Sequence, residues 1–248
     1  MEDTPFLSGK LSEDKAKALV GSLYLLTKVG VEKVILEFSI LNDVKTLYIN
    51  ALNTTGTVFV RVKYDPSFLD GFDLKETFKY GISKLQDFVS MLDMFKTGFE
   101  IKMAPEIASI SAEDNYLDYY GAEPSKIKRG EDGDIDSVVV SSFAVDPTFK
   151  TFITAIGKVE QNHVIFKGTK NDTESFIILS VADKDVRGNI FTRKVITPVQ
   201  ENFRISINKE YFSSVLTPGT NINIYREVIK LSKKDPLYNM EYFITTLL

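Results

Sequence analysis

The sequence contains no cysteine, no tryptophan and only one histidine among its 248 residues. Without cysteine the chain cannot form a disulfide framework, a thiolate metal site or a cysteine nucleophile. A single histidine excludes a histidine-rich metal site and leaves little general acid–base chemistry near neutral pH. These absences favour a binding or structural protein over an enzyme, and we predict no catalytic residue, no metal site and no cofactor.

Long apolar runs are also missing. The most apolar short stretch, Leu19–Leu26, is far shorter than the roughly 18–20 residues of a membrane span. The N-terminal Met1–Pro5 is acidic and lacks the basic start and apolar run of a signal peptide. We therefore expect no membrane association and a cytoplasmic location.

The composition is that of a folded globular protein, with 44% hydrophobic and 26% charged residues and a net charge of −4. Near the midpoint, Gly121–Ser137 has eight charged residues in seventeen and no apolar periodicity, which is typical of a linker. We predict one domain over residues 1–122, a linker over 123–137 and a second domain over 138–248.

Apolar spacing and turn residues predict helices and strands in a similar order on the two sides of this linker. The predicted helices are Ser12–Gly30, Ser83–Phe95, one that opens at Asp146-Pro147, and Asn208–Leu216. The predicted strands are Val31–Ile40, Thr46–Leu52, Thr57–Tyr64, Phe99–Met103, Ile107–Ser111, Tyr116–Tyr120, Val164–Lys167, Ser175–Val181, Ile190–Pro198, Asn221–Leu231 and Met240–Leu247. These few helices cannot cover both faces of the sheets. We therefore predict an α+β fold of antiparallel sheets with helices on one side.

The two halves also share residues. The pattern Phe78-Lys79-x-x-Ile82-Ser83-Lys84 recurs as Phe203-Arg204-x-x-Ile207-Asn208-Lys209, and Leu117–Tyr120 recurs as Met240–Phe243. These matches keep their order and are separated by close to half the chain length, which predicts an internal duplication. The alternative is that mixed helix–strand sequences share such short patterns by chance.

Lysines recur on the polar sides of the predicted helices. They are Lys17, Lys28, Lys84, Lys150, Lys158 and Lys209, with Lys10 just before the first helix. Acidic residues gather instead in the predicted loops and strands, so the helix faces suit sequence-independent contact with a phosphate backbone. The alternative is that lysine is simply a common, solubilising residue on helix surfaces.

This arrangement resembles the DNA polymerase sliding clamps, the family of proliferating cell nuclear antigen and the T-even-type phage processivity factors. Lys10-Leu11-Ser12 and Ser83–Leu92 resemble the phage clamps, whereas Gly188-Asn189-Ile190 and Met240–Ile244 resemble the cellular antigen. The resemblance implies a duplicated DNA clamp fold and a homotrimeric ring, with helices lining the hole and antiparallel sheets outside. It implies a processivity factor that encircles duplex DNA, is loaded by a clamp loader and tethers the replicative polymerase and other replication proteins, in a bacterial or phage-infected cell.

The resemblance also assigns roles to residues. The seven lysines above would face DNA, and the subunit interface would include Tyr116, Tyr119, Ile190 and Phe191. Client proteins would dock at Leu41, Val44, Ile127, Phe243, Ile244 and Thr245. Ile127 could instead be pinned to the core. Two other functions stay open: a clamp-like polymerase accessory protein that never encircles DNA, and a β-rich phage structural protein.

Overall fold

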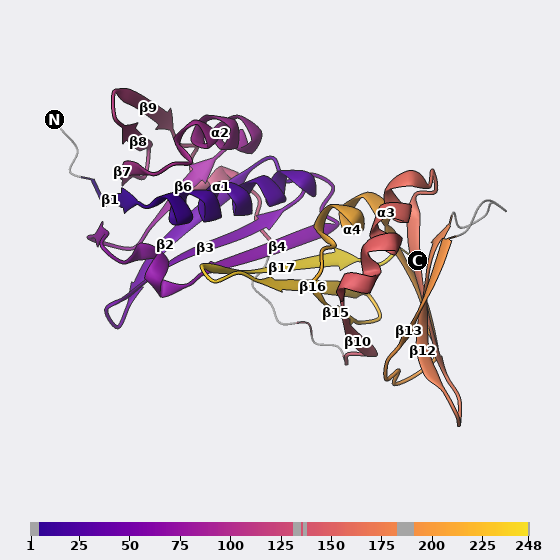
Figure 1. The fold of residues 1–248 in the computed structure, drawn as a ribbon. Coiled ribbons are helices and arrows are strands. Elements are labelled where there is room, and N and C mark those ends of the chain that lie inside the picture. Colours follow the sequence, from indigo (N-terminus) through magenta and orange to yellow (C-terminus); the bar gives the residue numbers. More distant parts are fainter. Residues whose placement is uncertain (1–4, 131–134, 136–137, 183–190, 248) are drawn as a thin grey trace. The chain divides into compact units, whose positions relative to one another are not determined.

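The computed structural model describes residues 5–130, 135, 138–182 and 191–247 (Figure 1). The chain divides into two compact units, which are described separately below. The first unit comprises Met1–Asp132 with Asp235–Met240, and the second comprises Gly133–Lys234 with Glu241–Leu248. Each unit is rich in antiparallel strands and has two α-helices, so the predicted α+β class is confirmed at this level.

The first unit contains two α-helices and nine strands among its described residues. Its helices are α1 (Glu13–Lys28) and α2 (Leu85–Leu92). Its strands are β1 (Leu7–Leu11), β2 (Val34–Leu41), β3 (Val44–Leu52), β4 (Val58–Tyr64), β5 (Asp73–Leu74), β6 (Phe78–Ile82), β7 (Phe99–Ala104), β8 (Ile107–Ala112) and β9 (Asn115–Tyr120). One sheet has the order β5-β1-β7-β8-β9, and β6, β2, β3 and β4 are adjacent in that order in another.

Alternating burial explains how these strands hold the helices. In β4 the side chains of Val58, Val60, Val62 and Tyr64 are fully buried, whereas the residues between them are at least partly exposed. The buried side of α1 carries apolar residues at helical spacing and packs beside α2 over this core. The hydroxyl of Ser22 bonds the hydroxyl of Tyr64, so both buried polar groups are satisfied.

The second unit contains two α-helices and eight strands among its described residues. Its helices are α3 (Lys150–Lys158) and α4 (Lys209–Val215). Its strands are β10 (Ser141–Ala144), β11 (His163–Lys170), β12 (Ser175–Ala182), β13 (Phe191–Ile196), β14 (Phe203–Asn208), β15 (Asn221–Ile224), β16 (Val228–Lys234) and β17 (Tyr238–Thr245), the last beginning in residues assigned to the first unit. One sheet has the order β13-β12-β11-β14, and β10, β15, β16 and β17 are adjacent in another.

The two units have the same strand order. The order β6-β2-β3-β4 of the first unit corresponds to β14-β11-β12-β13 of the second, and β1-β7-β8-β9 corresponds to β10-β15-β16-β17. In each unit one helix precedes the three consecutive antiparallel strands and the other follows the fourth strand of that sheet. The repeated pattern that the sequence suggested therefore has a counterpart in topology.

Several elements differ from the predictions. The predicted strand Asn221–Leu231 is wrong as a single strand, because Tyr225 N–H bonds Val228 O (2.9 Å) in a tight turn between β15 and β16. Strands β1, β5, β6, β10 and β14 were not predicted. Of these, β1, β5 and β10 are short and lack clear alternation. Ile190 and Gly188-Asn189 lie outside the described residues, so the strand is seen from Phe191 onward.

Candidate functional site

The exposed side of α1 carries one stripe of residues that face away from the core. Lys17, Gly21, Tyr24 and Lys28 follow one another at spacings of four, three and four residues, which places them on one face of a helix. Tyr24 is 44% exposed although it is a large aromatic residue. The polar stripe predicted from the sequence is therefore present, with an aromatic ring in it.

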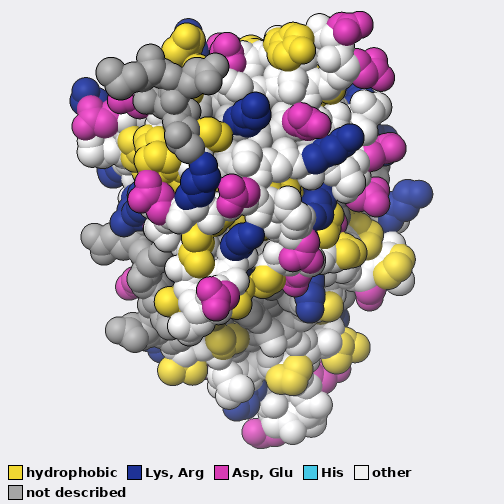
Figure 2. All heavy atoms as spheres, turned by 90° about the vertical axis from the view of Figure 1, so that its left-hand side faces the viewer, with side chains coloured by type: hydrophobic (Ala, Val, Ile, Leu, Met, Phe, Trp, Pro, Cys, Tyr) yellow, Lys and Arg dark blue, Asp and Glu magenta, His cyan; other side chains and the backbone are white. Residues whose placement is uncertain are grey.

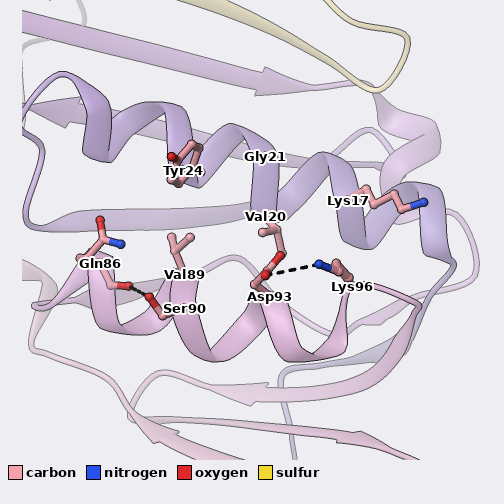
Figure 3. A pocket seen from close by; sticks show the side chains of 9 residues that line it. All are labelled: Lys17, Val20, Gly21, Tyr24, Gln86, Val89, Ser90, Asp93 and Lys96. Atoms are coloured by element: carbon pink, nitrogen blue, oxygen red, sulfur yellow. Dashed lines mark hydrogen bonds and ion pairs between the residues drawn. The ribbon is translucent and has the colours of Figure 1, made fainter. Parts of the chain in front are cut away.

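A groove of about 540 Å³ runs between α1 and α2 beside this stripe (Figure 3). Val20 and Val89 are the buried apolar residues of its lining. Its polar lining comes from both helices and the residues after α2: Lys17, Tyr24, Gln86, Ser90, Asp93 and Lys96. Gly21 contributes no side chain to the α1 wall.

The ammonium groups at the groove lie close to carboxylates. Lys17 pairs with Glu13 one helical turn earlier, and Lys96 Nζ lies 3.5 Å from an Asp93 carboxylate oxygen. The hydrogen bond from Lys17 lowers the pKa of the Glu13 carboxyl, and the same bond raises the pKa of Lys17. Such exposed pairs contribute little to stability because water and salt screen them, so either lysine can exchange its partner for a phosphate at small cost.

Lys28, the last residue of α1, lies beside the aromatic residue of the stripe. The Lys28 ammonium lies 4.6 Å from the centroid of the Tyr24 ring, within cation–π distance. A different face, drawn in Figure 2, also shows Lys and Arg side chains interspersed with Asp and Glu. A surface of this kind can attract a polyanion weakly without holding it in one position.

The other predicted DNA-facing lysines lie in different settings. Lys84 is the exposed N-cap residue of α2, and Lys150 and Lys158 are the exposed first and last residues of α3. Lys10 lies on β1 rather than on a helix. Lys209 is half-buried, and its ammonium donates a hydrogen bond to the Val159 carbonyl at the end of α3. Lys209 therefore connects α4 to α3 within the second unit.

One candidate interface strand, β9, is the last strand of its sheet. Tyr116 and Tyr120 are 82% and 75% exposed, whereas the Tyr119 ring packs 4.7 Å from Phe88 of α2. The Tyr119 carbonyl accepts a hydrogen bond from the Tyr80 hydroxyl (2.6 Å), and burial raises the pKa of both phenols. Tyr119 thus anchors β9 to its own unit, and Tyr116 and Tyr120 are its outward aromatic residues.

The other candidate interface strand, β13, is the last strand of the first sheet of the second unit. The Phe191 ring packs 5.9 Å from Phe152 of α3, and Arg193 stacks 3.9 Å from the Phe149 ring. Ile196, in contrast, is 86% exposed. The outward side of β13 is formed by alternate residues that begin at Thr192.

The predicted client-docking residues are spread over both units. Ile127 is 7% exposed and lies against β6, where Gly81 pairs with Ile35 of β2. Leu41 is six residues further along β2, about 20 Å away at 3.3 Å per residue, and is paired with Val44 at an exposed hairpin tip. Phe243, Ile244 and Thr245 are in β17 of the second unit. Within the first unit, Ile127 therefore does not meet Leu41 and Val44.

Gly81 explains how the start of the linker is held on β6. Ala122 N–H bonds Gly81 O (2.8 Å), and an added Cβ at Gly81 would lie 2.3 Å from the Ala122 carbonyl oxygen and 2.9 Å from Ile127 Cδ1. We predict that Gly81→Val displaces this segment and lowers the free energy of unfolding by about 1–3 kcal/mol, as overpacking does. Chemical denaturation measures this change in the free energy of unfolding. Gly56→Ala is the control, because a Cβ at position 56 meets open space and only the positive φ of that residue disfavours a side chain.

Sequence reasoning missed several residues of these surfaces. Tyr24 and Gln86 line the groove, and Tyr120 and Ile196 are outward residues of the two edge strands. Counting helical positions from Lys17 could have found Tyr24. Tyr120 and Ile196 required the alternation of each strand to be known, because a shift of one residue exchanges the two faces.

No helix in the described part of the chain is both long and apolar enough to cross a membrane. Among the same residues, no group of three or more His, Asp or Glu side chains could hold a metal ion.

Three solved structures are similar over nearly the whole chain. A. fulgidus PCNA, bound to the C-terminal region of FEN-1, has a TM-score of 0.72 at 14% identity and is matched over 98% of each chain. The PCNA2–PCNA3 complex of Sulfolobus tokodaii also gives 0.72 at 14% identity, over 96% of this chain and 98% of that one. Proliferating cellular nuclear antigen of Entamoeba histolytica gives 0.72 at 11% identity, over 98% and 100%. No protein-family model matches the sequence, and no curated protein is significantly similar to it.

These likenesses establish the fold. The chain has a PCNA-like sliding-clamp fold, as the resemblance in its sequence predicted.

Proposed function

We propose that this protein is a DNA sliding clamp, which encircles duplex DNA and tethers a replicative polymerase and other replication proteins to it. The observation that carries the proposal is the repeated strand order within a clamp-like fold, which leaves β9 and β13 as terminal strands of their sheets. Terminal strands expose unpaired backbone groups, and pairing with another strand satisfies them.

In this proposal three copies form a closed ring. The edge β9 of one copy pairs with the edge β13 of the next, and a head-to-tail contact of this kind gives a ring when the rotation closes. The relatives support assembly and partners, since one structure contains two PCNA chains and another contains bound FEN-1. We extend this to a homotrimer, a clamp loader and duplex DNA for the present chain, with the duplicated units as its two clamp domains.

DNA contact in the proposed ring is electrostatic and independent of sequence. Lys17, Lys28 and Lys84 on the first unit and Lys150 and Lys158 on the second would contact phosphates, which carry no base information. Topological linkage needs no tight site, so exposed lysines with nearby carboxylates suffice to keep contacts weak and exchange fast.

Client docking is proposed at exposed apolar residues away from the helices. Leu41 and Val44 are 72% and 45% exposed at the β2–β3 hairpin, which is the apolar surface that a peptide with aromatic anchors needs. We propose this exposed hairpin as a docking surface of the first unit.

Sedimentation velocity on the purified full chain tests the assembly. We expect a species of three times the 28.0 kDa chain mass at micromolar concentration, in equilibrium with monomer on dilution. A strictly monomeric protein that still binds a polymerase would favour the alternative of an accessory protein that does not encircle DNA.

A further inference from the structure

Gly21 lies in the interior of α1, where glycine weakens a helix relative to alanine because it has more backbone freedom to lose. The fold gives no reason for it. Its φ is not positive, and apart from the adjacent backbone of α1 a Cβ at this position would have no atom within 4 Å. An alanine would therefore fit without any rearrangement of the protein.

The other described glycines show how unusual this is. Five have positive φ values, and five more would place a Cβ within 3.0 Å of another atom. Only Gly21 and Gly157 have neither property among the described residues, and each lies in the helix that precedes the three-stranded run of its unit. Contacts within the folded chain therefore do not require glycine at either position.

At Gly21, the space left by the missing side chain opens into the α1–α2 groove. Gly21 lies on the exposed stripe between Lys17 and Tyr24, and Figure 3 shows that this part of the α1 wall has no side chain. The lining offers the ammonium groups of Lys17 and Lys96, the Tyr24 hydroxyl and the Gln86 amide around a narrow apolar floor, and its one carboxylate, Asp93, is paired with Lys96. These donors and cations complement a chain of phosphodiester anions more closely than they complement an apolar peptide.

We propose that Gly21 keeps the groove open for the sugar–phosphate backbone of duplex DNA, which passes closest to the protein at this point. The inference rests on the proposed clamp function and adds a residue without charge to the DNA-facing surface. A side chain at position 21 would hold the backbone away from Lys17, Tyr24 and Gln86 together, so the loss would increase with side-chain size.

The proposal predicts opposite effects on stability and on DNA binding. Gly21→Ala and Gly21→Gln should raise the Tm by about 2–4 °C, because each removes a helix-interior glycine without a clash. Binding of a short fluorescent duplex at low ionic strength should weaken slightly for Gly21→Ala and several-fold for Gly21→Gln. Ala18→Gln is the matched control, since it adds the same side chain to α1 outside the groove lining and should leave duplex affinity unchanged.

The outcomes separate this inference from the proposed function. If the wild-type chain neither assembles nor binds duplex DNA, the clamp proposal itself is wrong. If the wild-type chain binds duplex DNA and Gly21→Gln binds equally well with a raised Tm, the clearance role of Gly21 is wrong and the clamp proposal stands. Weaker binding by Ala18→Gln to the same extent as Gly21→Gln would also overturn the role of the groove.

Discussion

Replacing Lys194 with proline is expected to leave the protein folded but monomeric. Asn171 N–H bonds Glu174 O (3.0 Å) at the β11–β12 turn, and antiparallel bonding alternates along the strands. The even-numbered residues of β12 therefore bond β11, and its odd-numbered residues bond β13. Because Leu179 is paired with Arg193, the odd-numbered residues of β13 bond β12, and the N–H of Lys194 points to the open edge. Proline is tolerated at such an edge position, but it cannot donate the bond that a neighbouring copy would need.

We expect each interface to lose about 1–2 kcal/mol of association free energy, because one hydrogen bond is missing and the proline ring crowds the edge. Sedimentation at several protein concentrations measures this loss of association. Thermal unfolding checks that the second unit is still folded. Lys194→Thr is the control, because it removes the ammonium and keeps the N–H. Arg193→Pro should instead unfold the second unit, since that N–H faces β12. Normal assembly of Lys194→Pro would rule out pairing through the β13 edge.

Removing the exposed lysines of the helix faces together is expected to abolish duplex binding at moderate salt. Single changes to alanine should have small effects, because each removes one of many screened interactions with phosphates. For every phosphate that the protein no longer neutralises, the slope of log affinity against log salt should decrease in magnitude by about 0.9. The combined variant changes Lys17, Lys28, Lys84, Lys150 and Lys158 to alanine.

Two controls make this result specific. An equal number of exposed lysines on strands and the linker should be replaceable without loss of binding: Lys63, Lys102, Lys126, Lys128 and Lys167. Lys209→Ala should lower stability rather than DNA affinity, because its ammonium bonds the Val159 carbonyl. Fluorescence anisotropy on duplexes of different sequence measures the effect. A loss confined to one DNA sequence would contradict a contact made through phosphates.

Much of the fold could be predicted because its signals are local. The apolar spacing from Leu19 to Leu26 is enough to place α1, and the repeated Ile82-Ser83-Lys84 and Ile207-Asn208-Lys209 mark the starts of α2 and α4. Short elements such as β1 and β10 could not be predicted, because their pairing partners are distant in sequence and supply most of their stabilisation.

The candidate site was predictable in residue type but not in partners. Lys17 and Lys28 lie on the exposed stripe of α1 as expected, yet the hydrogen bond from Lys209 to Val159 joins residues fifty positions apart. Tyr119 and Tyr120 differ by one position, and only the pleat decides which of them packs on Phe88 and which is exposed. The Gly21 position became informative only when the space around its missing side chain was known.

Retention on a linear duplex with blocked ends tests encirclement most directly. The protein would be threaded onto linear DNA through its free ends, which would then be blocked by bulky groups, and the complex washed at high salt. A closed ring should stay on the DNA through the wash and leave it as soon as the duplex is cut between the blocks. Loss of the protein during the wash, or retention that cutting does not reverse, would contradict a ring around the duplex.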